Sequence, residues 1–149
     1  MPTSVDFLIL CDAAQVSPDS KLHLLGGAWT HHQRPVPQNP PPGSPPPISQ
    51  FAIAAGFLVD WNETDQPLVV RISVEDDDNR PLAEVAGQLV VSRHPDAIRG
   101  TDQRALFAVP VTMAFERSGP HHVRARIDGR NVDKVTHFTV VDVPVPARQ

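Results

Sequence analysis

The sequence predicts an all-β domain, an immunoglobulin-like β-sandwich of about eight antiparallel strands. Three observations lead to this prediction. Apolar residues recur at every second position in several segments, which is the period of a strand with one buried face. Clusters of proline, glycine, aspartate and serine separate these segments. No window of eleven or more residues carries an apolar stripe at helical spacing, which favours two packed sheets over an α/β design.

The length and the net charge of the chain limit the classes of protein to which it can belong. A chain of 149 residues is the size of one domain, and we expect a single sandwich over residues 1–143, followed by a C-terminal tail at 144–149. The formal net charge is -4, and the thirteen Lys and Arg residues are scattered along the chain. A basic face for phosphates is therefore not expected, and nucleic acid is excluded as a predicted partner.

The lone cysteine, Cys11, excludes a disulfide within the chain and suits a reducing compartment. No Lys or Arg precedes the apolar run Phe7–Cys11, and Asp6 interrupts it. The run is too short for a signal sequence or a membrane span. We therefore expect a cytoplasmic protein without a membrane partner.

The first predicted strand, Val5–Ala14, carries apolar residues at both odd- and even-numbered positions, which is typical of a strand covered on both sides. The turn residues at 17–20 return the chain as a second strand over Lys21–Trp29. Gly26 and Gly27 in that strand indicate a bulge or a close backbone approach. Residues 30–47 are rich in proline, which lacks the amide hydrogen of a strand ladder, and they are predicted to form a loop between strands 2 and 3.

Six further strands follow, and most of them show the same alternation. A long polar connection is expected over Arg93–Arg104, and short polar or glycine-containing turns separate the other strands. The predicted strands begin and end near Phe51–Val59, Leu68–Glu75, Pro81–Ser92, Phe107–Phe115, Val123–Asp128 and Phe138–Val140.

Several short motifs suggest a family. The opening carries Val5–Asp12, Val16–Asp19 and Leu24–Trp29, and later segments include Trp61–Thr64, Asp102–Arg104, Gly119–Pro120 and Ile127–Gly129. With these motifs the chain resembles an uncharacterised actinobacterial family of small immunoglobulin-like β-sandwich proteins. The resemblance implies a compact cytoplasmic sandwich, with no assigned activity and no catalytic residues to transfer.

Acidic residues occur at two predicted turns. Carboxylate oxygens are the ligands that calcium prefers, so the two turns could form one calcium site if they met at one end of the sandwich. Consecutive aspartates at a hairpin tip are also common solvated turn formers, which is the alternative. The candidate ligands are Asp76, Asp77, Asp78, Asp60 and Asp65.

Other reactive side chains give little support to an enzyme. The pairs at 31–32 and 121–122 are adjacent histidines, and neighbours on a strand point to opposite faces, so we expect exposed loop histidines in place of a zinc site. Cys11 lies in a strongly apolar strand, where a thiol is a core residue more often than a nucleophile. No catalytic residue and no cofactor is predicted.

The proline tract is a candidate for partner binding. Proline runs favour the polyproline II conformation, which partner grooves recognise with little ordering cost, although such tracts are also common as passive spacers. Trp29 is assigned to packing, whereas Trp61, beside a turn, either packs or presents its ring to a partner. The candidate residues are Pro40, Pro41, Pro42, Pro45, Pro46, Pro47 and Trp61.

Together these patterns favour a non-catalytic binding or scaffold module that interacts with another protein. Open sandwiches have edge strands that need covering, so self-association into a homo-oligomer is a second expectation. The alternative is a small-ligand or calcium-binding domain, or an enzyme, with an acidic loop site at one end of the sandwich. A concave pocket with converging polar groups would favour that alternative.

Overall fold

The computed structural model describes residues 2–145 and confirms the all-β prediction. This part of the chain contains nine strands, one more than predicted, and a single 3₁₀ helix, η1 (Trp61–Glu63). The strands are β1 (Ser4–Val16), β2 (Leu22–Gly27), β3 (His31–Pro37), β4 (Ile48–Val59), β5 (Pro67–Asp76), β6 (Pro81–Val90), β7 (Gln103–Ala114), β8 (Gly119–Ile127) and β9 (Asp133–Val145).

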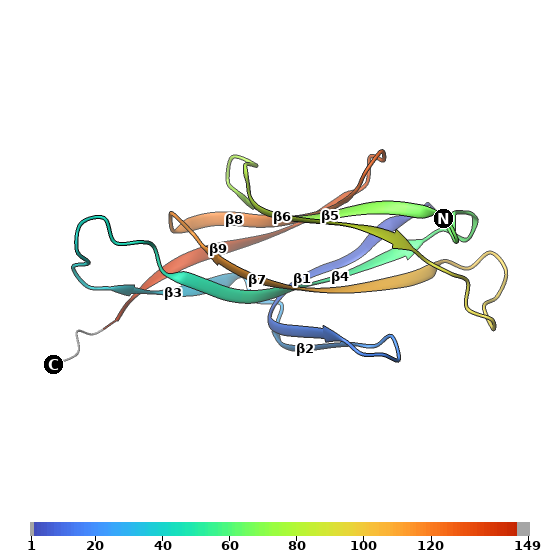
Figure 1. The fold of residues 1–149 in the computed structure, drawn as a ribbon, viewed down its shortest axis with the longest axis horizontal. Coiled ribbons are helices and arrows are strands. Elements are labelled where there is room, and N and C mark those ends of the chain that lie inside the picture. The colour runs from blue at the N-terminus through green and yellow to red at the C-terminus, as the bar shows by residue number, and fades with distance from the viewer. Residues whose placement is uncertain (1, 146–149) are drawn as a thin grey trace.

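The strands form two sheets that lie one above the other (Figure 1). Sheet A has the order β2-β1-β4-β7, and sheet B has the order β3-β9-β8-β5-β6. All neighbours pair antiparallel except β3 and β9, which pair in parallel. Each sheet therefore ends in two edge strands: β2 and β7 for sheet A, and β3 and β6 for sheet B.

The core lies between the two sheets, and the predicted alternation explains which residues enter it. Val70, Ile72 and Val74 of β5 point inward, as do Val123, Ala125 and Ile127 of β8. Leu8 and Leu10 of β1, with Phe51, Ile53, Ala55 and Phe57 of β4, meet them from sheet A. Full burial of a side chain such as Phe57 contributes about 1.5–3 kcal/mol, so these facing rows are the main stabilising feature.

The first strand is covered on both sides around Leu8–Cys11, as its sequence predicted, whereas Asp12 and Ala13 of the predicted range are exposed. Leu8 and Leu10 enter the main core, whereas Cys11 joins a second buried cluster with Ala52 and Ala54 of β4. At Gly26, one of the two glycines for which the sequence indicated a bulge or a close backbone approach, the Asp12 side chain lies against the backbone, since Gly26 has φ +58° and a Cβ there would overlap the Asp12 carboxylate. Only glycine fits this position without displacing its neighbour.

The prediction that residues 30–47 are entirely loop was wrong, because His31–Pro37 form β3. β3 is an edge strand that pairs on one side only, with β9, and edge positions tolerate Pro35 and Pro37. The buried Arg34 side chain fixes the strand. Its Nε lies 2.7 Å from Asp142 Oδ1 of β9, and its guanidinium also donates to the carbonyl of Phe115.

The prediction that a C-terminal tail begins at residue 144 was also wrong. Pro144 and Val145 belong to β9, where they pair with Val36 and Pro37, so the strand runs two residues past the predicted domain end. Residues 146–149 of the predicted tail lie outside the described residues. Within residues 2–145, no helix is long and apolar enough to cross a bilayer.

Candidate interaction surface

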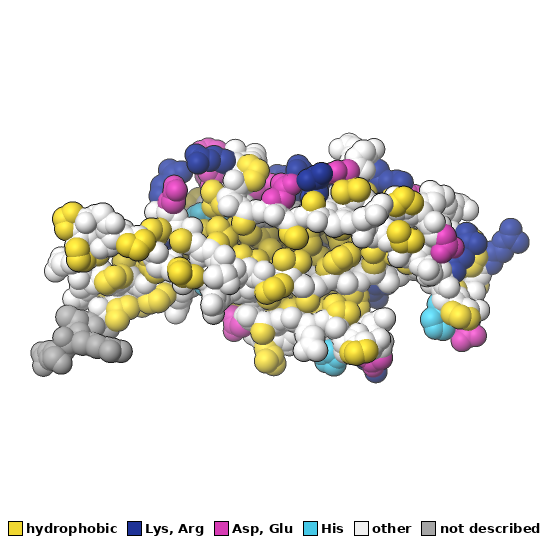
Figure 2. Space-filling view, in the orientation of Figure 1, with side chains coloured by type: hydrophobic (Ala, Val, Ile, Leu, Met, Phe, Trp, Pro, Cys, Tyr) yellow, Lys and Arg dark blue, Asp and Glu magenta, His cyan; other side chains and the backbone are white. Residues whose placement is uncertain are grey.

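One side of the molecule is open between the sheets. β6 ends sheet B and β7 ends sheet A, and both lie at the front of Figure 1. Figure 2, drawn in the same orientation, shows hydrophobic atoms exposed along the length of the gap between the two layers. We call this surface the open side and define it by the strands β6 and β7.

The small side chains of β6 explain why the gap stays open. Its inward residues are Ala83, Val85, Gly87 and Leu89, because these pair with the inward residues of β5. Alanine and glycine do not reach β7, which leaves an apolar groove of about 170 Å³ and a second of about 80 Å³. The first groove is lined by Ile53, Ile72, Val74, Ala83, Glu84, Val85, Val109, Pro110, Val111 and Thr112.

Apolar side chains on β6 itself are exposed. Val85 is 45% exposed and Val90 is 56% exposed, although both lie in a strand of ten residues. Glu84 is the one charged residue between positions 82 and 90, and no proline occurs there. A long, apolar edge with few charges is the type of edge to which another strand adds.

The other three edges are less suited to strand addition. β3 carries Pro35 and Pro37, and β7 carries Pro110 in its middle, so each lacks amide hydrogens along its edge. β2 has six residues and ends in two glycines. Natural proteins use such prolines and short strands to prevent edge-to-edge pairing, and β6 differs from the other edges because it has ten residues and its one proline, Pro81, is its first residue.

The outer face of sheet B carries a buried polar network. Glu75 accepts hydrogen bonds from Ser73 Oγ at 2.7 Å and from Arg124 Nε at 3.1 Å, and its Oε1 lies 2.7 Å from His122 Nε2. The Glu75 and His122 side chains are 4% and 5% exposed. Burial alone would raise the pKa of Glu75, but the three hydrogen-bonding partners outweigh burial and hold that pKa below its ordinary value.

The order of these groups does not form a nucleophilic triad. The Glu75 carboxylate stands between Ser73 and His122, so no hydrogen bond from Ser73 Oγ to the imidazole is present. A serine nucleophile needs direct contact with its base. The network thus satisfies buried polar groups and ties β5 to β8, and it gives no catalytic arrangement.

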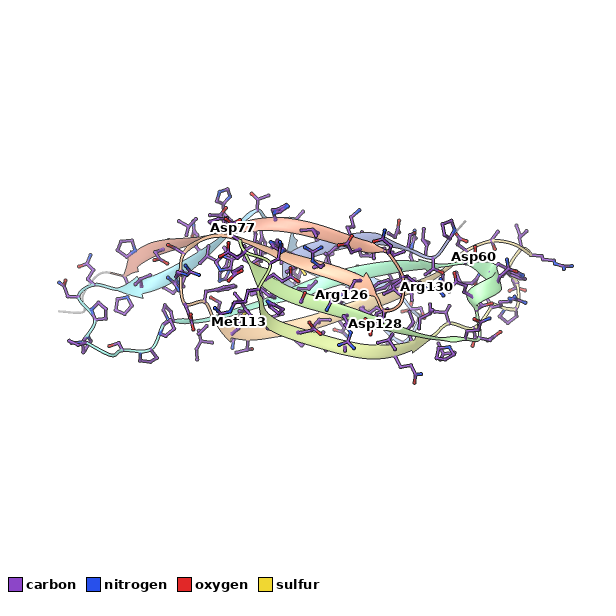
Figure 3. The ribbon with its side chains drawn as sticks, turned by 90° about the horizontal axis from the view of Figure 1, so that it is seen from above. Asp60, Asp77, Met113, Arg126, Asp128 and Arg130 are labelled. Atoms are coloured by element: carbon purple, nitrogen blue, oxygen red, sulfur yellow. The ribbon has the colours of Figure 1, made fainter. Side chains whose placement is uncertain are left out.

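A shallow polar hollow of about 400 Å³ lies beside this network. Its basic residues include Arg124, Arg126 and Arg130, and each has an acidic partner: Asp133, Glu84 and Glu63, respectively. Figure 3 shows Arg126, Arg130 and Asp128 together near the turn that joins β8 to β9. Because acidic side chains already neutralise these arginines, the hollow offers little free charge to an anion.

The structure does not bring the predicted calcium ligands together. Asp60 and Asp65 precede β5, whereas Asp76, Asp77 and Asp78 lie at its far end, and a ten-residue strand spans roughly 30 Å. Figure 3 shows Asp60 and Asp77 at well separated positions. Among residues 2–145 there is no cluster of three His, Cys, Asp or Glu side chains that could hold a metal ion.

The Asp76 carboxylate stabilises the turn between β5 and β6. Its Oδ1 accepts hydrogen bonds from the amides of Asp78 and Arg80, both at 2.9 Å. The Arg80 amide is the largest cause that lowers the pKa of Asp76, and the Asp78 amide adds to it. This is the turn-forming role that the sequence offered as the alternative to calcium.

The predicted partner-binding residues lie at two places apart from the open side. Pro40, Pro41, Pro42, Pro45 and Pro46 are exposed in the loop between β3 and β4, and Pro47 is half-buried before β4. Trp61 lies in η1, where the Arg93 guanidinium carbon stacks 4.0 Å from the ring centroid. One face of the Trp61 ring is therefore covered by its own chain.

The prediction of exposed histidines was wrong for His121 and His122, which are both buried. They do point to opposite faces of β8, as expected. His121 packs against Phe115 and Phe138 in the core, whereas His122 meets Glu75 on the outer face. No local sequence pattern indicates this contact, because Glu75 is 47 residues away and its pairing depends on the register of β5 and β8.

Comparison with known proteins identifies a family but not a biochemical function. No curated protein matches the chain. A family model described as "Family of unknown function (DUF6941)" matches residues 6–141, which includes all of the strands except the ends of β1 and β9. The chain is therefore a member of the DUF6941 family of unknown function.

Proposed function

We propose that this protein is a non-catalytic binding or scaffold module that binds another protein at its open side. The observation that carries the proposal is the β6 edge, which is ten residues long, apolar, nearly uncharged and bordered by an apolar groove. Strand addition supplies main-chain hydrogen bonds for affinity, while side chains of the added strand fill neighbouring pockets. The grooves between β6 and β7 are placed to receive such side chains.

We further propose that the two sheets form an immunoglobulin-like sandwich. The order β9-β8-β5-β6 corresponds to strands G, F, C and C′ of a variable-type domain, and β1-β4-β7 corresponds to A, B and E. In that correspondence, strand D next to β7 has no equivalent. The shared strand order supports the proposal of an immunoglobulin-like sandwich. The missing strand D also gives a reason for the open side between β6 and β7, because a strand D would lie on the free edge of β7.

A cytoplasmic location is part of the same proposal, supported by the single buried thiol of Cys11. The alternative, a calcium-binding, small-ligand or enzymatic domain with an acidic loop site, has less support. Its five aspartates lie at the two ends of β5, and Asp76 uses its carboxylate to hold a turn. The polar groups that do converge, around Glu75, are occupied with one another.

A site-specific photocrosslinker tests the proposed binding surface. p-Benzoylphenylalanine would replace Val85 on β6 in one variant and Leu25 on β2 in the control, since Leu25 is also apolar and is 73% exposed. After irradiation in cells that contain the natural partners, we expect adducts from position 85 that are absent from position 25. No adduct at position 85, or the same adducts at both positions, would contradict the proposal.

A further inference from the structure

We propose that the strand added to β6 is β6 of a second copy of this chain, in an antiparallel pair centred on Ala86. This inference rests on the proposed function, because it names the partner of the open side. The pair would join two copies of sheet B into one continuous sheet around a two-fold axis. Such self-complementary pairing is the usual geometry of a symmetric dimer.

The hydrogen-bonding direction of β6 follows from its neighbours. The Asp128 amide donates to the Val69 carbonyl at 2.9 Å, in register with the pairing of β8 and β5. In an antiparallel ladder the backbone groups alternate between the two neighbours, so odd-numbered residues of β5 bond to β8 and even-numbered ones bond to β6. Val70 and Ile72 face Gly87 and Val85, so the odd-numbered residues of β6 are the ones that bond to β5.

The even-numbered residues of β6 consequently direct their N–H and C=O groups away from the molecule. Val74 pairs with Ala83 but Glu75 pairs with Pro81, so a bulge interrupts this alternation at Leu82, and the regular outward residues are Glu84, Ala86, Gln88 and Val90. A second β6 in antiparallel orientation pairs with the outward groups of Glu84, Ala86 and Gln88 when Ala86 lies opposite Ala86 of the second copy. Glu84 then lies opposite Gln88, so the outward backbone groups from 84 to 88 are all paired.

Charge favours this register. Glu84 is held from within its own sheet by Arg71 at 3.0 Å and Arg126 at 3.5 Å, and its cross-strand neighbour in the pair is the neutral Gln88. A shift that centres the pair on Glu84 would set two carboxylates directly opposite each other, which is destabilising. The charges on β6 therefore permit pairing with a second copy in the register centred on Ala86 and disfavour the register centred on Glu84.

Shape favours the same register on the groove side. A Cβ at Gly87 would meet no atom within 4 Å, so there is open space beside that residue. Val85 is 45% exposed, and in the pair centred on Ala86 it lies opposite Gly87 of the second copy. Ala83 likewise lies opposite Leu89. Each larger side chain on one strand thus meets a smaller one on the other, twice by symmetry.

Cysteine crosslinking tests both the partner and the register. In the full chain, Ala86→Cys would place two thiols opposite each other, with Cα atoms about 5.5 Å apart, which is within the range of a disulfide. Under mild oxidation we expect Ala86→Cys to form a disulfide-linked dimer. Gln88→Cys and Glu84→Cys are the matched controls, which we expect to stay monomeric in a denaturing gel, since neither faces itself. Equal crosslinking of all three variants, or of a control in place of Ala86→Cys, would overturn the inference.

A proline variant tests the association without a new bond. Ala86→Pro removes an amide hydrogen that points outward, so it would block a second β6 while leaving the ladder to β5 intact. Sedimentation should show a dimer for the natural chain and a monomer for Ala86→Pro, with similar melting temperatures at low concentration. A natural chain that is monomeric at all concentrations, or an Ala86→Pro variant that remains dimeric, would overturn the inference.

The failure of this inference is distinguishable from the failure of the proposed function. If the chain is monomeric but the photocrosslinker at Val85 captures a protein of different mass, a foreign strand occupies the open side and only the self-pairing is wrong. If the chain is monomeric and position 85 gives no adduct, both are wrong. An adduct of twice the chain mass would support both.

Discussion

Glu75 and His122 face each other from adjacent strands, with Oε1 and Nε2 2.7 Å apart, and both side chains lie almost completely out of solvent on the outer face of sheet B. A buried carboxylate is stable only when its partners compensate for lost hydration. Here Ser73 and Arg124 complete that compensation. The pair therefore links the stability of the fold to pH and to single substitutions.

The first prediction concerns acid stability. Because the folded-state pKa of Glu75 is below its ordinary value of 4.5, its ionised form stabilises the fold above that value. The contribution is lost as the pH falls from about 4.5 through the lower folded-state pKa. Urea unfolding as a function of pH should show this loss for the natural chain and a smaller loss for Glu75→Gln. An unchanged acid profile in Glu75→Gln would contradict this role.

Glu75→Gln should also lower the free energy of unfolding at neutral pH. Removing one partner from a buried charged network costs about 3 kcal/mol, because the remaining groups lose their compensation. Glu84→Gln is the matched control, since Glu84 is also paired with arginines of sheet B but is 29% exposed. We expect less than about 1 kcal/mol for the control. Similar losses in the two variants would mean that burial of Glu75 has no special energetic effect.

Arg34 should fasten β3 to the rest of the fold. In Arg34→Gln, the buried Phe115 carbonyl loses its donor and Asp142 loses its ion pair, which should cost about 2 kcal/mol. Amide exchange in β3 should increase more than elsewhere. Arg104→Gln, which removes the 54% exposed Arg104 side chain from its ion pair with Asp6, should cost less than about 1 kcal/mol. If β3 exchange is unchanged in Arg34→Gln, the strand does not depend on this side chain.

A tight contact between Phe7 and Gly56 gives a packing prediction. A Cβ on Gly56 would overlap the Phe7 ring, so Gly56→Ala should destabilise the protein by about 1–3 kcal/mol. Phe7→Leu introduced into Gly56→Ala should recover part of this loss. A double-mutant cycle in urea measures the coupling. Additive effects of the two substitutions would show that the ring does not restrict position 56.

The Cys11 thiol should be unreactive in the folded protein. Burial raises its pKa, the charge of Asp12 adds to the increase, and the side chain is 0% exposed. A thiol reagent should label the chain only in denaturant. Gln15→Cys, at an exposed position of the same strand, should add one rapidly reacting thiol. Rapid labelling of the natural folded chain would contradict the burial of Cys11.

Much of the fold was predictable because the alternation of apolar and polar residues is visible within each strand's own sequence. The inward residues of β5 and β8, the two-sided burial of β1 and the close approach at Gly26 all follow from their own segments. β3 was not predictable in the same way, since its parallel partner β9 is about a hundred residues away and its prolines are typical of a loop.

The candidate site was less accessible from sequence. Acidic turn residues stand out in the sequence, but the direction of β5 separates them, whereas the Glu75 network is assembled by pairing across strands. The open side depends on strand order in both sheets. Sequence alternation gives the faces of β6 and β7, but it does not show that both are edges on the same side.

Residue-resolved amide exchange along β6, measured at increasing protein concentration, tests the central claim most directly. The amides of Val85, Gly87 and Leu89 should be protected at every concentration, because they bond to β5. The amides of Glu84, Ala86 and Gln88 should exchange rapidly in dilute solution and become protected as the chain associates. Protection of these even-numbered amides in the dilute monomer, or no gain when the chain associates, would contradict the assignment of β6 as the docking edge.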